Sequence, residues 1–192
     1  MSRRARALAL AAAALLALGA LGVGAYVLLG GSDTETLETP EFSFDYPSEW
    51  ERIEGVQFPL AEAAAQQEVG KNTVGLDPDN WVTAYGGQGG VEISAQNIDQ
   101  LLGLATPFYR KTFEEAGGRM LQDPYRVRAA GLPAIRFRVA IKSVRGVAVE
   151  DEVTTLYRGR RIYTVNCQNR PERATEITAG CARVLESFTP KP

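Results

Sequence analysis

The sequence contains no histidine and only two cysteines, Cys167 and Cys181. The lack of histidine excludes Ser-His and Cys-His nucleophilic pairs, histidine metal sites and histidine pH switches. The two cysteines do not have the C-x-x-C spacing of a redox-active pair. We therefore expect a protein that is not an enzyme and has no catalytic residue, cofactor or metal site.

Beyond the first six residues, basic residues are outnumbered by acidic ones. The chain has 21 basic and 23 acidic residues, and Arg3, Arg4 and Arg6 are the only charges before Asp33. Without these three arginines the balance is 18 basic against 23 acidic residues, or 18 − 23 = −5. A nucleic-acid-binding surface needs concentrated lysine and arginine, so we expect no nucleic-acid partner.

One long uncharged run, residues 7–30, follows the three arginines. At ~1.5 Å per helical residue it is long enough for a bilayer core of roughly 30 Å. Basic residues before it and acidic residues after it place the N-terminus in the cytoplasm and the rest outside. We expect a basic cytoplasmic segment (1–6), a single-pass transmembrane anchor (7–30), a solvated linker (31–40) and an extracytoplasmic domain (41–190).

The alternative for residues 7–30 is a cleaved signal peptide. The apolar region is long for that role, which typically takes about 7–15 residues, yet the small residues of Val23-Gly-Ala25 suit cleavage. The domain is exported under both interpretations. It stays at the cell membrane in the first and is secreted in the second.

The exported part contains both strand and helix patterns. Alternating apolar residues predict strands at 42–46, 74–76, 81–85, 91–98, 125–129, 135–141, 147–157 and 160–168. Apolar residues at three- and four-residue steps predict helices at 60–69, 99–116 (with Asp99 as N-cap) and 174–188. Glycines at 86–90 predict a flexible hairpin loop, and Arg158-Gly159 predicts a tight turn. Both faces of the last strand carry apolar groups, so we expect a sheet covered on both sides.

The two cysteines lie on faces that we expect to meet. Cys167 ends the last strand, and Cys181 lies on the apolar stripe of the last helix. In the oxidising space outside the membrane they favour a disulfide. Such a bond should stabilise the domain by roughly 3 kcal/mol. The alternative is two buried free thiols in a reducing compartment.

Two further groups have both a functional and a structural interpretation. Trp81 and Phe108 are candidate ligand-binding residues, although such aromatics more often belong to the core. Asp77, Asp79 and Asn80 offer oxygen ligands suited to calcium, but they lack the regular spacing and distal glutamate of a calcium loop. We expect a β-turn there.

Two charged clusters are interpreted in the same way. If the hairpin turn is centred near Val144, Arg138 lies opposite Asp151, and cross-strand ion pairing accounts for the Glu150-Asp-Glu152 run without catalysis. Three arginines, at 158, 160 and 161, crowd one hairpin tip. They suit an anionic envelope polymer, but a solvated turn is the simpler explanation.

Four segments together resemble a known family. They are Phe42-Ser-Phe-Asp-Tyr-Pro-Ser-Glu-Trp50, Gly131-Leu-Pro-Ala-Ile-Arg-Phe137, Ile162-Tyr-Thr-Val165 and Ala182-Arg-Val-Leu-Glu-Ser-Phe188. These segments resemble PsbP-like and Mog1-like domains, which also occur in anchored envelope proteins of actinobacteria. The resemblance implies an α+β fold, an α/β/α sandwich around a central antiparallel sheet. It transfers no functional residue, because the motifs mark structural positions.

These observations favour a membrane-anchored, extracytoplasmic, non-enzymatic binding or assembly domain of the cell envelope. Its partners would be the membrane and an envelope protein or cell-wall component of unknown identity. The alternative is a carrier or sensor of a lipid or cell-wall fragment. That alternative requires an apolar cavity of about 300 Å³ or more, walled by Trp81 or Phe108.

Overall fold

The computed structural model describes residues 33–56 and 69–192. The expected anchor and nearly all of the predicted helix at 60–69 lie outside these residues. In the described part of the chain, no helix is both long enough and apolar enough to cross a bilayer. Residues Thr34 to Pro192 belong to one compact unit.

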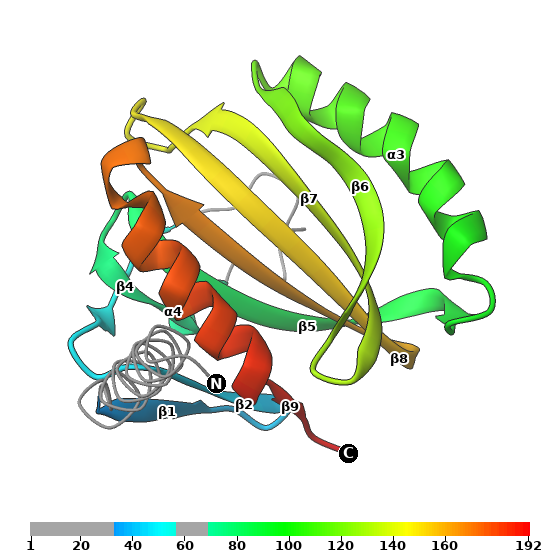
Figure 1. The fold of residues 1–192 in the computed structure, drawn as a ribbon, viewed down its shortest axis with the longest axis horizontal. Coiled ribbons are helices and arrows are strands. Elements are labelled where there is room, and N and C mark those ends of the chain that lie inside the picture. The colour runs from blue at the N-terminus through cyan, green and yellow to red at the C-terminus, as the bar shows by residue number, and fades with distance from the viewer. Residues whose placement is uncertain (1–32, 57–68) are drawn as a thin grey trace, which may run out of the picture. The chain divides into compact units, whose positions relative to one another are not determined.

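A six-stranded antiparallel sheet forms the centre of this unit (Figure 1). In spatial order its strands are β3 (Glu51–Arg52), β4 (Thr73–Asp77), β5 (Asn80–Ile93), β8 (Ala148–Asn169), β7 (Leu132–Lys142) and β6 (Arg119–Ala129). The alternation in β7 is as predicted: Ile135, Phe137, Val139 and Ile141 are buried, and Arg136 and Arg138 are not. Burying every second side chain is what makes this segment a strand.

Strand β8 folds back on itself. Its first half, Ala148 to Leu156, pairs with β7, and its second half, Gly159 to Gln168, pairs with β5. Gly159 has φ +64°, a conformation that favours glycine. Figure 1 shows the chain reversing at this point. The tight turn predicted at Arg158-Gly159 is therefore confirmed.

A smaller antiparallel sheet contains β1 (Thr34–Glu38), β2 (Phe42–Pro47) and β9 (Thr189–Pro190), in the order β1-β2-β9. The linker expected at 31–40 is therefore wrong for residues 34–38, which form β1. Leu37 is 1% exposed and packs in the core, while main-chain pairing with β2 orders the polar residues around it.

A helix covers each face of the central sheet. Helix α3 (Ile98–Glu115) packs Phe113 against Phe137 of β7, with ring centroids 5.8 Å apart. Helix α4 (Ala174–Ser187), preceded by the short 3-10 helix η1 (Pro171–Arg173), packs in one cluster with Ala134 of β7. Ala134 and Phe137 point to opposite faces because side chains alternate along a strand. The layers are thus helix, sheet and helix, as expected.

Strand β5 corrects the prediction of a loop at 86–90. The strand extends from Asn80 to Ile93, and Gly86 and Gly87 pair with Tyr163 and Ile162, while the register shifts between Gln88 and Ile93. A Cβ at Gly89 would lie 2.8 Å from Cδ1 of Ile162, so the glycine allows a close approach. The strand predicted at 91–98 reaches only Ile93. Helix α3 begins after Asn97, and the N-cap predicted at Asp99 is wrong by two residues.

Candidate functional site

The last strand and the last helix are joined by a disulfide between Cys167 and Cys181. Their Cα atoms are 6.1 Å apart, and both residues are 3% exposed. The predicted pairing is confirmed. The bond ties the second half of β8 to the buried stripe of α4, which also contains Ile177, Val184 and Leu185.

Trp50 and Gly180 fix the position of α4 on the sheet. Any side chain at Gly180 would clash with the six-membered ring of Trp50. Trp50 is buried in the main core cluster, so it is a packing residue. The close approach of helix and ring leaves no room for a ligand between them.

A pocket of about 150 Å³ lies beside the disulfide, where α4 begins. Arg138, Glu150, Glu152 and both cysteines are among the residues that line it. Nη2 of Arg138 lies 2.6 Å from Oε2 of Glu150. A second pair joins Arg136 Nη1 to Glu152 Oε1 at 3.5 Å. The predicted cross-strand ion pairing is therefore present for the two glutamates.

Asp151 does not take part in this ion pairing. The register places Arg138 opposite Glu152 and Asp151 opposite Val139, one residue away from the predicted pairing. A shift of one residue turns a side chain to the other face of the sheet. Asp151 therefore points toward the α3 side, where it is fully buried (0% exposed).

Burial raises the pKa of Asp151 to about 8. Within the described structure, neither carboxyl oxygen makes a hydrogen bond, and the Asn166 amide makes none either. Asn166 lies close enough to favour the charged form, but this lowers the pKa less than burial raises it. Asp151 is thus a protonated carboxylic acid at neutral pH.

Three phenols occupy the same face of the sheet. Burial raises the pKa of Tyr85 to about 12 and also raises the pKa of Tyr109 and Tyr157. These groups remain neutral at neutral pH and do not provide a base to accept the Asp151 proton. The sequence signal for this buried acid was available: Asp151 lies between Val149 and Val153 in the alternation of β8.

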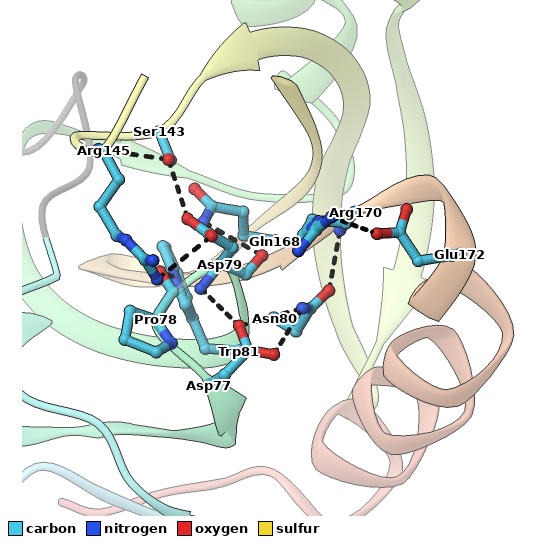
Figure 2. Close-up of polar contacts among 10 residues, drawn as sticks. All are labelled: Asp77, Pro78, Asp79, Asn80, Trp81, Ser143, Arg145, Gln168, Arg170 and Glu172. Atoms are coloured by element: carbon cyan, nitrogen blue, oxygen red, sulfur yellow. Dashed lines mark hydrogen bonds and ion pairs between the residues drawn. The ribbon is translucent and has the colours of Figure 1, made fainter. Parts of the chain in front are cut away.

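A second polar network closes the end of the sheet at the β4–β5 turn (Figure 2). The Asp77 carboxylate accepts hydrogen bonds from the main-chain N–H of Asp79 (2.8 Å) and from Nδ2 of Asn80. The buried Asp79 carboxylate accepts a hydrogen bond from Ser143 Oγ at 2.9 Å and pairs with Arg145 Nη1 at 3.3 Å. This is the β-turn that we expected in place of a calcium loop.

The oxygens of this network are directed at protein donors. Asn80 Oδ1 accepts the main-chain N–H of Arg170, and the main-chain oxygen of Asp79 accepts a long hydrogen bond from Gln168. Figure 2 shows these groups converging from three separate segments of the chain. In the described residues, no three acidic or cysteine side chains are placed to hold a metal ion.

Trp81 and Phe108 lie in different surroundings. Trp81 is 1% exposed, packs with Ile53, Val56 and Val69, and donates its indole N–H to the Pro78 oxygen at 3.2 Å. Phe108 lies on α3 and is 61% exposed. The pocket beside the disulfide is lined by neither residue. A ligand-binding role for either of them stays a prediction.

The outer side of α3 also exposes Leu104, by 70%. Leu104 and Phe108 are four residues apart and therefore lie on the same side of the helix. The burial of Phe113 shows that the inner side of α3 is already used for packing. Phe108, unlike Phe113, therefore lies outside the core.

No family model matches the chain, and no curated protein matches it. Solved structures do match. The PsbP protein CyanoP from Synechocystis sp. PCC 6803 has 8% identity and a TM-score of 0.55, covering 83% of this chain and 94% of its own. LpqN, involved in cell envelope biogenesis of Mycobacterium tuberculosis, has 11% identity and a TM-score of 0.49, covering 83% and 91%.

The domain therefore has the PsbP-like fold, and the expectation from its motifs is confirmed. The structural match establishes the fold, and at 8% identity it establishes nothing beyond the fold. A shared fold does not imply a shared activity, because function depends on particular side chains. No residue role passes from these neighbours to this chain.

Proposed function

We propose that the chain is a membrane-anchored, extracytoplasmic, non-enzymatic binding or assembly domain of the cell envelope. The observation that carries this proposal is the Cys167–Cys181 disulfide. Stable disulfides belong mainly to proteins that fold in oxidising compartments outside the cytoplasm. The uncharged run at 7–30 and the arginines before it supply the matching export signal.

A binding role fits the chemistry of the described side chains. The interior carboxyl, Asp151, is enclosed and has no second catalytic group beside it, while Glu150 and Glu152 are held by arginines. The apolar side chains on the outer side of α3 form no part of the core. Exposed aliphatic and aromatic pairs of this kind are suited to contact with another protein.

The compartment is tested by denaturing whole cells directly in a thiol-alkylating reagent without a reductant. We expect Cys167 and Cys181 to resist alkylation until a reductant is added. Full alkylation without reductant would remove the main support for export. Mass spectrometry of the mature N-terminus tests the anchor, and cleavage after Ala25 would show a secreted protein.

Site-specific photocrosslinking in the native envelope tests the binding role. A photoreactive residue at position 108 on α3 should give a discrete crosslinked product. The same residue at Glu186, which is exposed on α4, is the control. Equal products at both positions would indicate random collisions and argue against a defined binding surface on α3.

A further inference from the structure

Four arginines gather at one end of the central sheet: Arg128, Arg158, Arg160 and Arg161. We refer to them as the arginine tip. Pairing of Ala134 with Leu156 brings the β6–β7 turn next to the turn of the β8 hairpin, and Figure 1 shows both turns at the same end. Of the four arginines, only Arg161 is partly buried.

The charges of the arginine tip are not neutralised by acidic partners. Arg158 Nη1 donates to the main-chain oxygens of Pro190 (3.1 Å) and Lys191 (3.2 Å). Arg128 Nη2 donates to the main-chain oxygen of Gly131 at 2.7 Å. A carbonyl orients a guanidinium group without cancelling its charge. The side chains of Arg160 and Arg161 make no ion pair with any carboxylate in the described part of the chain.

Most of the other arginines in the described residues form ion pairs. Seven of them each lie within 4 Å of a carboxylate: Arg110, Arg126, Arg136, Arg138, Arg145, Arg170 and Arg173. Carboxylates do lie nearby, at Glu92 beside Ile93, which pairs with Gly159, and at Glu38 and Glu41 beside Lys191. In the described structure none of them forms an ion pair with the tip. The tip is therefore a local excess of positive charge on an acidic domain.

We propose that the arginine tip docks on the anionic phospholipid head groups of the membrane that holds the chain. This inference rests on the anchoring in the proposed function. Guanidinium groups bind phosphate oxygens through paired hydrogen bonds, and a group already oriented by a carbonyl loses less freedom on binding. Anchoring would hold the domain close to the head groups at high effective concentration.

The test uses the full chain in nanodiscs of phosphatidylcholine alone or mixed with phosphatidylglycerol. Amide hydrogen exchange is followed at residues 128–133 and 157–161. In the anionic discs we expect exchange there to be about tenfold slower, as for a tip that is docked roughly nine-tenths of the time. High salt should remove the difference, because exposed charges are screened.

Matched double variants separate the tip from general charge. R160Q/R161Q should abolish the lipid-dependent protection. R170Q/R173Q removes the same charge at the other end of the β8 hairpin and should retain it. Equal exchange in neutral and anionic discs, or equal loss in both variants, would overturn the inference.

Two additional outcomes identify what has failed. If soluble polyphosphate protects the tip and anionic discs do not, the partner is a free polyanion and the lipid inference is wrong. If the N-terminus is cleaved, the anchor in the proposed function fails, and pelleting of the mature chain with anionic vesicles still tests the tip. Absence of pelleting would then refute docking on lipid independently.

Discussion

Replacing Asp151 by asparagine tests whether one buried carboxyl dominates the pH dependence of stability. The substitution keeps the size of the side chain and removes its ionisation. Asp151 is fully buried, and burial raises its pKa from 3.8 to about 8. In the unfolded chain the same group titrates near ~3.9. Between these values the folded domain holds a proton that the unfolded chain has lost.

The sign and size of the effect follow from this difference. Because the folded state binds more protons, the free energy of unfolding falls as pH rises, by about 1.4 kcal/mol per pH unit. The Asp151 contribution is fully present below pH ~4 and is lost by pH ~8. Over the whole window the loss is about 6 kcal/mol. From pH 5 to pH 8 we expect a fall of about 4 kcal/mol.

The assay is urea unfolding of the oxidised domain, residues 33–192, at several pH values between 5 and 8. The D151N variant should show little slope over this range and should be the more stable protein at pH 8. Asp123, half exposed and paired with Arg110, provides the control, and D123N should keep the wild-type slope. The reasoning would be refuted if D151N kept the wild-type slope.

The remaining predictions concern packing and the disulfide. Reduction of Cys167–Cys181, or the C167S/C181S variant, should lower the free energy of unfolding by roughly 3 kcal/mol, and an unchanged urea midpoint would contradict this. G180A should destabilise the domain by about 1–3 kcal/mol because the methyl group meets the Trp50 ring, as measured by thermal unfolding. G103A in α3 meets nothing within 4 Å and should stabilise by up to about 1 kcal/mol, so equal effects of the two substitutions would argue against the packing explanation.

The features that depend on residues close together in the sequence could be predicted from it. The turn at Arg158-Gly159 follows from a glycine that tolerates positive φ, and β7 follows from strict alternation. The disulfide followed from placing the two cysteines on faces that must meet. In each case the residues within one element already contain the deciding information.

Distant pairing decided the features that the sequence did not reveal. Residues 34–38 are mostly polar and become β1 only because β2 is available to pair with them. Gly86 and Gly87 belong to β5 because they pair with the returning half of β8. The orientation of Asp151 depended on a hairpin register that differed by one residue from the predicted one. The alternation of Val149, Asp151 and Val153 indicates that Asp151 is on the buried face, but its partner on β7 is fixed only by the pairing itself.

The order of strands in the small sheet has a consequence for the timing of folding. β2 is among the first parts of the domain to be synthesised, and its neighbour β9 lies at the last residues. Phe42 likewise stacks on Phe188, with ring centroids 5.3 Å apart. Contacts of such wide sequence separation form slowly, and here they cannot form until the C-terminus has been made. The small sheet is thus completed only after β9 has been synthesised, although β1 and β2 can pair before then.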